Sequence, residues 1–407
     1  NRILPRSLWR RAGTAGILFL AALAGLGVSL GCATAGHASP STTHRAAAAP
    51  TATTAPQAAP AAPRAAPHSL SPAQLAGQRI IYAYSGLKPP GTLLAAIRAG
   101  EAAGVILFGP NVASAAQVHA TVSQLQRANA ASPVHTPLLI LTDQEGGAVR
   151  RLPGAPSLSE RQIGQRANGV ALAQRAGTGA GRTLAGAGIN VNLSPVVDVF
   201  RRSGNFIDEF GRSYSGNPNT VSRLARAFIQ AQQRTGVAAT AKHFPGLGAA
   251  SQAQNTDLRL VTLNLAPAQL RAVDEAPYRA AISAGVKLVM TSWAIYPALD
   301  PRNPAGLSAA VIQRELRGRL RYRGVTISDT IESGALNRYG SLAQRGILAA
   351  GAGSDLIICS AIDPTANSPS IGTGVLNGIA TALSDGRLSK AAADQAAARV
   401  LSLREHP

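Results

Sequence analysis

The chain has few acidic residues, and this shortage bears on the partners it can attract. Its 407 residues include 39 Lys and Arg but only 19 Asp and Glu, giving a formal net charge of +20. Such an excess draws anionic partners such as cell-wall polymers, lipid head groups or nucleic acid. No dense Lys/Arg block occurs, so we expect the charge to be dispersed over the surface. No basic stripe is interleaved with aromatic residues, and we therefore expect no nucleic-acid binding.

Cysteine, metal-ligand clusters and nucleotide motifs are also scarce. The cysteines are Cys32, which lies in an N-terminal leader, and Cys359, which follows an apolar run and is expected to be a buried, inert thiol. Beyond Leu70, the sparse histidines show no metal-ligand spacing. The glycine cluster Gly177-Thr-Gly179 completes no dinucleotide fingerprint, and no phosphate loop is present. We therefore expect neither a metal nor a cofactor.

The N-terminal part of the chain has the composition of an export leader followed by a spacer. Residues 1–35 combine arginines with an apolar run, as a signal peptide or a membrane or lipid anchor does. Cleavage at Ala33-Thr34-Ala35, lipidation of Cys32 and retention as an anchor all place the following domain outside the cytoplasm. Residues 36–68 are rich in Ala, Pro and Thr, which predicts a disordered linker. Only the N-terminal segment is expected to meet a membrane.

Residues 69–407 alternate short apolar runs with amphipathic stretches, which predicts one α/β domain. The runs lack polar alternation, as strands buried on both faces do. There are eight predicted strands: Ile80–Ala83, Val105–Phe108, Leu138–Thr142, Ile189–Leu193, Ala238–Ala241, Leu288–Thr291, Val325–Ser328 and Leu356–Ile358. Predicted helices between them include 114–128, 221–235, 267–284 and 309–320, and a last one spans 390–404. This pattern predicts a (β/α)8 barrel of the TIM type. We also expect the protein to be a monomer.

Polar side chains follow most of these runs, at the strand ends where barrel enzymes carry their sites. They are Asp143, Asp198, Lys242 with His243, Ser292 with Trp293, Asp329 and Ser360. Because the carboxyl ends of parallel barrel strands share one rim, we expect these side chains to meet around a ligand.

Asp329 is the candidate for the reacting group. A carboxylate at a strand end can attack an anomeric carbon, although Asp also suits the N-cap of a following helix. Asp143 precedes two adjacent glycines and can accept hydrogen bonds from sugar hydroxyls, while Arg151, Lys242 and His243 can donate. As alternatives to ligand binding, Arg151 and Arg212 can form ordinary ion pairs, and His243 can be a core residue whose hydrogen bonds are all made within the protein.

Seven motifs in order give the chain a resemblance to glycoside hydrolase family 3, and within it to the single-domain β-N-acetylhexosaminidase branch. They are Val105–Asn111, Asp143–Arg151, Asn192–Asp198, Gly211–Tyr214, Lys242–Gly246, Val289–Thr291 and Ser328-Asp329. The resemblance implies a barrel, a retaining mechanism and N-acetylglucosamine-containing glycans of cell-wall fragments as substrates. It implies Asp329 as nucleophile. It also implies Asp143, Arg151, Arg212, Lys242 and His243 as ligands of the first sugar.

The sequence departs from that branch where the general acid/base is expected. The branch carries Asp-Ser-His shortly after Lys-His-Phe-Pro-Gly-His-Gly, whereas this chain has Leu247 in the first motif and Ala253-Gln-Asn255 for the second. Asn does not shuttle protons at neutral pH. Asp257 on the same loop can replace the acid if burial raises its pKa. Alternatively, the substrates carry good leaving groups or the sugar passes to another acceptor, or the protein binds sugar without turnover.

Trp293 is a further departure, because many relatives have a histidine after Met-Thr. We expect Trp293 to contribute to substrate binding.

Overall fold

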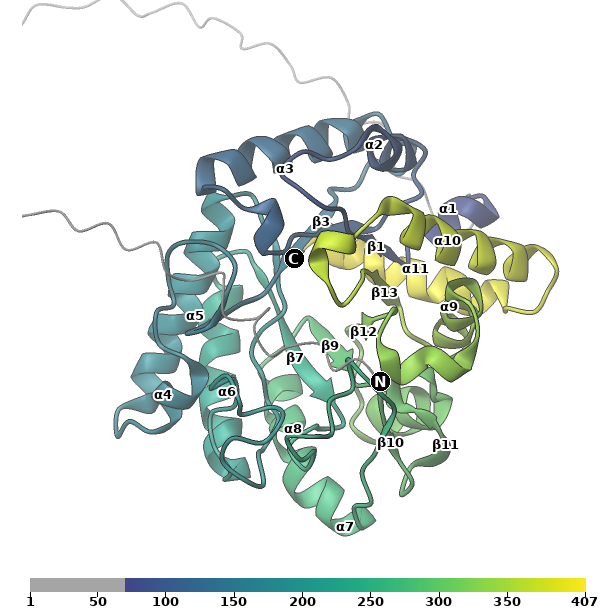
Figure 1. The fold of residues 1–407 in the computed structure, drawn as a ribbon. Coiled ribbons are helices and arrows are strands. Elements are labelled where there is room, and N and C mark those ends of the chain that lie inside the picture. The colour runs from purple at the N-terminus through teal and green to yellow at the C-terminus, as the bar shows by residue number, and fades with distance from the viewer. Residues whose placement is uncertain (1–69) are drawn as a thin grey trace, which may run out of the picture. The chain divides into compact units, whose positions relative to one another are not determined.

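The computed structural model describes residues 70–407, and these form a closed barrel surrounded by helices (Figure 1). The predicted leader (1–35), including Cys32, lies outside the described residues, as does the predicted linker (36–68). Eight parallel strands close the barrel in chain order: β1 (Ile80–Tyr82), β2 (Gly104–Ile106), β3 (Leu139–Thr142), β6 (Val191–Asn192), β7 (Ala238–Phe244), β9 (Leu288–Thr291), β12 (Val325–Thr330) and β13 (Leu356–Cys359). The predicted (β/α)8 architecture is confirmed.

Alternate strand residues face opposite sides of the barrel wall, which divides the core into an inner and an outer layer. Ile81, Leu139 and Leu141 pack with one another inside the barrel, while Ile80 and Ile140 pack against the surrounding helices. Buried branched residues on both faces explain why the strands read as continuous apolar runs in the sequence.

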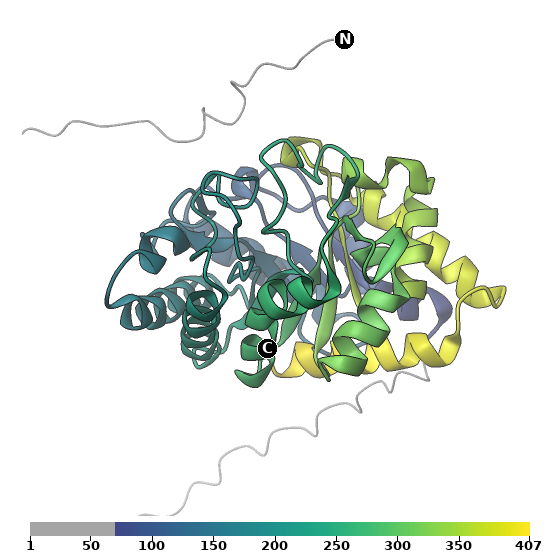
Figure 2. The ribbon, with the colours of Figure 1, turned by 90° about the horizontal axis from the view of Figure 1, so that it is seen from below.

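The helices form the outer layer. They are α1 (Pro72–Gly77), α2 (Gly91–Arg98), α3 (Ala115–Ala130), α4 (Glu160–Gly164), α5 (Gly169–Gly186), α6 (Pro218–Gln233), α7 (Pro267–Gln269), α8 (Ala276–Ser283), α9 (Leu342–Ala352), α10 (Pro369–Ser384) and α11 (Lys390–Glu405). The predicted helix at 267–284 divides into α7, a π-turn and α8, and Ala310–Arg319 is a π-helix. Seen from below, α4 to α6 and the C-terminal helices lie on opposite sides (Figure 2).

Helices α5 and α6 approach closely because glycines line their contact. A Cβ on Gly177 would lie 2.3 Å from the carbonyl oxygen of Phe228, and one on Gly181 would lie 2.0 Å from the Thr235 hydroxyl. The glycine cluster that fails as a nucleotide motif therefore lies in a helix contact.

Helix α11 closes the amino end of the barrel through Arg404, which is almost fully buried. Its guanidinium donates to the carbonyls of Thr136 (2.7 Å) and Pro137 (2.8 Å), just before β3, and to Gln78, just before β1. Catalytic residues of such barrels lie at the other end.

Short hairpins and strands outside the barrel extend its carboxyl end. They are β4 (Gln144–Gly146) paired with β5 (Val149–Arg150), and a three-stranded sheet of β8 (Val261–Thr262), β10 (Ala294–Tyr296) and β11 (Asp300–Pro304). The β4–β5 turn needs glycine, since Gly146 and Gly147 adopt φ values of 115° and 56°.

Candidate active site

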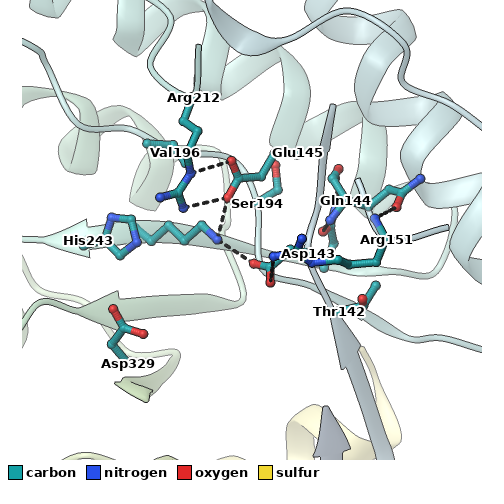
Figure 3. A network of polar contacts seen from close by, with 12 residues as sticks. Thr142, Asp143, Gln144, Glu145, Arg151, Ser194, Val196, Arg212, His243 and Asp329 are labelled. Atoms are coloured by element: carbon teal, nitrogen blue, oxygen red, sulfur yellow. Dashed lines mark hydrogen bonds and ion pairs between the residues drawn. The ribbon is translucent and has the colours of Figure 1, made fainter. Parts of the chain in front are cut away.

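The strand register brings the candidate nucleophile and the Lys-His motif to the same level of the barrel. Ser328 of β12 and Phe244 of β7 both pair with Thr291 on the intervening strand β9. Asp329 and His243, which adjoin these paired residues, therefore lie at the same carboxyl end, and Figure 3 shows them on facing sides of one region.

A buried cluster of two carboxylates and two cations forms one half of this site (Figure 3). Lys242 Nζ lies 2.8 Å from both Asp143 Oδ1 and Glu145 Oε1. Arg212 grips Glu145 with two parallel bonds of 2.8 and 2.9 Å, and Arg151 lies 3.6 Å from Asp143. We call Asp143, Glu145, Lys242 and Arg212 the ion-pair cluster.

The charges in the ion-pair cluster stabilise one another. Burial alone would raise the pKa of Asp143, but Lys242 and Arg151 outweigh it and hold that pKa well below its usual range. Burial would likewise lower the pKa of Lys242, yet Asp143 and Glu145 raise it. All members therefore stay charged at neutral pH, presenting fixed donors and acceptors to a polar ligand. The ion-pair alternative holds for Arg151 and Arg212, and it does not exclude ligand contacts, because both side chains keep partial exposure.

Asp198, at the end of the segment after β6, orients the imidazole of His243. His243 Nδ1 lies 2.8 Å from Asp198 Oδ2, and the backbone N–H groups of His243 and Leu247 also donate to this carboxylate, the latter at 2.6 Å. Because a carboxylate accepts, Nδ1 carries the proton and Nε2 is left as the nitrogen available to a ligand. His243 is thus buried, and only one of its two ring nitrogens, Nδ1, has a hydrogen-bond partner in the part of the chain that the structure describes.

Asp257 lies within electrostatic reach of Asp329, on a loop that the segment after β12 holds in place. The Gly334 N–H donates to the Asp257 carbonyl at 2.7 Å, and the Ser333 hydroxyl donates to the Thr256 carbonyl at 2.5 Å. A Cβ at Gly334 would lie 2.3 Å from the Leu258 carbonyl oxygen, so this close approach requires glycine. Burial, followed by the Asp329 carboxylate, raises the pKa of Asp257 to about 6, although Arg212 and His243 oppose the shift.

Asn255, at the position where the branch has its histidine, supports Asp257 instead. Its side-chain oxygen accepts from the Asp257 backbone N–H at 2.7 Å. The side chain of Leu247 is buried in the apolar core and only its backbone N–H faces Asp198.

Asp329 does not cap a helix. It lies within β12, and its carboxylate accepts the N–H of the next residue, Thr330, at 2.7 Å. The following 3-10 helix, Gly334–Tyr339, is capped by Ser333. The N-cap alternative is therefore wrong, and the Asp329 carboxylate is free to meet a ligand.

Trp293 occupies a different place from the one we expected. The side chain is 1% exposed, its indole N–H donates to the Thr330 carbonyl at 2.9 Å, and a Cβ on Gly306 would lie 2.4 Å from the ring. No indole face remains for a sugar. Trp293 instead supports the end of β12, next to Asp329, through its hydrogen bond to Thr330.

Sequence reasoning missed Glu145 and Glu160 as members of the site and gave Asp198 no particular role. Glu160 is fully buried and accepts the Val196 N–H at 3.1 Å and the Ser194 hydroxyl at 3.3 Å, which fixes the segment leading to Asp198. Burial and the neighbouring Glu145 raise the pKa of Glu160 well above its usual value. The motif Asp143–Arg151 contains a second carboxylate, Glu145. Because a buried carboxylate needs partners, this residue could have been predicted from the sequence to pair with the cations of the site.

The thiol of Cys359 is buried and unpaired, as predicted, and burial raises its pKa. Among residues 70–407, no three His, Cys, Asp or Glu side chains are arranged to hold a metal ion. Within the same range, no helix combines the length and apolar character that a membrane span requires.

The carboxyl end of the barrel thus carries Asp329 at the end of β12, Asp257 on a loop held by the segment after β12, and the ion-pair cluster. The family model for the glycosyl hydrolase family 3 N-terminal domain matches residues 75–403. The chain belongs to glycoside hydrolase family 3, and the resemblance seen in its motifs is confirmed.

Curated relatives and solved structures agree with this assignment. An uncharacterized secreted glycosyl hydrolase of Arthroderma benhamiae is 45% identical over 330 residues, 81% of this chain and 92% of that protein. A β-hexosaminidase of Nitrosomonas eutropha is 33% identical over 262 residues, 63% of this chain and 72% of that protein.

Two solved structures superpose over most of the barrel. A family 3 β-N-acetylglucosaminidase from Paenibacillus sp. has a TM-score of 0.77 at 33% identity and covers 83% of this chain, which spans only 63% of that protein. A β-N-acetylhexosaminidase from Beutenbergia cavernae has a TM-score of 0.74 at 32% identity, with 83% and 99% coverage.

Proposed function

We propose that the protein is an exported, retaining glycoside hydrolase acting on β-N-acetylglucosaminides or related cell-wall sugars, with Asp329 as nucleophile and Asp257 as general acid/base. The observation that carries the proposal is the placement of two carboxyl groups at the carboxyl end of the barrel, Asp329 in β12 and Asp257 on a loop hydrogen-bonded to the segment after β12. Retaining glycosidases require such a pair, one ionised and one able to hold a proton near neutral pH.

In the first step an Asp329 oxygen attacks the anomeric carbon while the bond to the leaving oxygen breaks, and Asp257 donates its proton to that oxygen. In the second step Asp257 takes a proton from water, the water oxygen attacks the anomeric carbon, and the bond to Asp329 breaks. With a pKa of about 6, Asp257 is partly protonated at neutral pH and can serve in both directions.

The ion-pair cluster and the adjoining Arg151 provide the sugar-binding groups. Arg151 and Arg212 keep 29% and 18% of their side chains exposed, and Asp143 keeps 13%, while their charges are already balanced. A neutral sugar then meets donors and acceptors that need no reorganisation. His243 Nε2 adds a ligand contact whose direction Asp198 fixes.

The names of relatives support the substrate class and the location. A Beutenbergia cavernae relative is a β-N-acetylhexosaminidase, and the Arthroderma benhamiae relative is named as secreted. The predicted leader at 1–35, cleaved, lipidated or retained, is how we propose that the domain leaves the cytoplasm.

Hydrolysis of an activated aryl N-acetylglucosaminide tests the proposal. We expect turnover by the wild type and a loss of at least roughly 10³-fold in Asp329→Ala, as when a catalytic nucleophile is removed. Asp394→Ala, which removes a partly exposed carboxylate on α11, is the matched control and should keep full activity. Equal background rates for wild type and Asp329→Ala would overturn the enzyme proposal.

The occupied Asn255 side chain favours a second candidate, a cell-envelope sugar-binding protein with weak or no turnover. This candidate predicts calorimetric binding of N-acetylglucosamine that Asp143→Ala weakens, together with background hydrolysis. Measurable turnover that depends on Asp329 would exclude it.

A further inference from the structure

A second region with binding features lies on the outer wall of the barrel, on helices rather than on the strand ends. Helices α5 and α6 lie side by side there (Figure 1). One solvent-open hollow of about 440 Å³ runs along α5, and another of about 460 Å³ lies between α5 and α6, with Gln174 shared by both. We call these joined hollows the arginine groove, because Arg175, Arg182, Arg223 and Arg226 line them.

All four groove arginines are exposed, and none makes a hydrogen bond or ion pair within residues 70–407. Their helices offer no counter-charge, since α5, α6 and the adjoining α8 contain neither Asp nor Glu. The site arginine Arg212 differs, because Glu145 holds it at 2.8 Å. The groove is therefore a concentrated, uncompensated positive surface, rather than part of the dispersed charge expected from the sequence.

The spacing suits an extended anionic chain. Arg175 and Arg182 are two helical turns apart, about 10 Å along α5, and Arg223 and Arg226 are neighbours on one face of α6. Guanidinium groups bind phosphate oxygens in a bidentate manner. No aromatic side chain lines either hollow, so the stacking platforms that single-stranded nucleic acids use are missing from the groove. A concave groove also fits a chain better than the flat surface of a bilayer.

We propose that the arginine groove binds a linear, phosphate-bearing polymer and holds the protein on it through the outer wall of the barrel. Because the groove lies on helices and the candidate active site lies at the carboxyl strand ends, both can be occupied together. The proposal does not depend on turnover at Asp329.

The test measures binding of the full chain to fluorescently labelled long-chain inorganic polyphosphate by anisotropy over a series of salt concentrations. The groove variant carries Arg175→Gln, Arg182→Gln, Arg223→Gln and Arg226→Gln. The matched control carries Arg98→Gln, Arg127→Gln, Arg314→Gln and Arg323→Gln. These four arginines are also exposed and lie elsewhere on the domain, and replacing them removes the same charge. Gln suits the helices that carry seven of the eight exchanged arginines, and Arg323 is exposed outside them, so both variants should fold, which circular dichroism checks.

We expect the groove variant to bind at least about tenfold more weakly. Its slope of log affinity against log salt should fall by roughly 3, about 0.7 for each phosphate that is no longer neutralised. The control should keep affinity and slope close to the wild type, and both variants should hydrolyse a soluble aryl glycoside as the wild type does. Equal weakening in both variants would overturn the proposal in favour of general charge attraction. Tighter binding to polyglutamate, duplex DNA or phosphatidylglycerol vesicles than to polyphosphate would overturn the assignment of the partner.

Discussion

The two halves of the candidate active site differ in how firmly the fold fixes their charges. In the ion-pair cluster every carboxylate has a cation within 2.8 Å. In the reacting half, Asp329 and Asp257 have no ion pair among the described residues. The Asp329 carboxylate accepts the Thr330 N–H, and the Asp257 N–H donates to the side chain of Asn255. The charges of the ion-pair cluster are thus fixed by their partners, while the other half holds Asp257, a carboxyl group whose protonation can change near neutral pH.

Under the proposed function, this difference separates sugar binding from chemistry at one barrel end. Groups that must keep one charge are placed opposite partners, which fixes their pKa values far from neutrality. A group that must exchange a proton is instead buried beside a like charge, which brings the pKa of Asp257 to about 6.

The largest expected effect comes from breaking the binding half at Lys242. Lys242→Met leaves Asp143 and Glu145 buried without their shared cation, so the free energy of unfolding should fall by about 3–5 kcal/mol. Urea denaturation measures the change. Lys88→Met, which removes an exposed lysine, is the control and should change stability little. Equal stability of the two variants would show that the cluster does not hold the site together.

Replacing Asp257 in the reacting half should slow the reaction, and at acidic pH it should leave stability nearly unchanged. Asp257→Asn should slow hydrolysis of unactivated N-acetylglucosaminides by about 10²–10⁴-fold, because the leaving oxygen loses its proton donor. The first step with an activated aryl leaving group needs no such proton and should slow far less. Comparing kcat/KM for the two substrates measures this contrast, and equal slowing, or none, would remove Asp257 from the mechanism.

The pH profile sharpens the same contrast. The general acid is protonated only below its pKa, so kcat/KM for unactivated substrates should decline as pH rises through about 6. That limb should be missing in Asp257→Asn. A profile that keeps it in the variant would assign the titration to another group.

Asp198 orients His243, which follows Lys242 of the ion-pair cluster in β7, and its replacement should have an intermediate effect. Asp198→Asn keeps the shape but offers fewer acceptors to His243 Nδ1 and the two backbone N–H groups, which should cost about 1–3 kcal/mol of stability. Because His243 is proposed to contact the sugar, KM should rise more than kcat falls. A purely structural role would lower stability without this change in KM.

The last expected effect, which appears only at alkaline pH, is on the stability of Asp257→Asn. The pKa of Asp257 is raised from 3.8 to about 6 on folding, so its stabilising contribution is complete below the unfolded value and is lost as pH rises through 6. Asp257→Asn should therefore be more stable than the wild type at pH 8, by at most about 3 kcal/mol, with no such gain near pH 4. Thermal or urea unfolding at the two pH values measures the difference. A gain of equal size at both would contradict the raised pKa.

The sequence predicted the barrel well because buried parallel strands leave an unmistakable apolar run. The strand Leu288–Thr291 is observed with the predicted ends, while β7 extends to Phe244 and β12 to Thr330. Because of these extensions, Lys242, His243 and Asp329 lie within the strands instead of after them. Where a strand ends depends on its pairing with neighbouring strands, which local composition does not reveal.

The parts that the sequence did not predict depend on contacts between distant segments. Glu145 of β4 pairs with Lys242 and Arg212, which lie far from it in the sequence and are brought to it by the closed barrel. Trp293 turns inward because Gly306 leaves room for its ring. The arginine groove likewise joins two helices whose arginines look scattered along the chain.

Trapping the intermediate tests the central claim most directly. Asp257→Asn, incubated with an activated aryl N-acetylglucosaminide, should form the glycosyl-enzyme quickly and release it slowly, since the second step lacks its base. Peptide mass spectrometry of the quenched protein should then find one N-acetylglucosamine residue, esterified to Asp329. Steady turnover with no sugar on the protein, or a sugar attached to a different residue, would contradict the account.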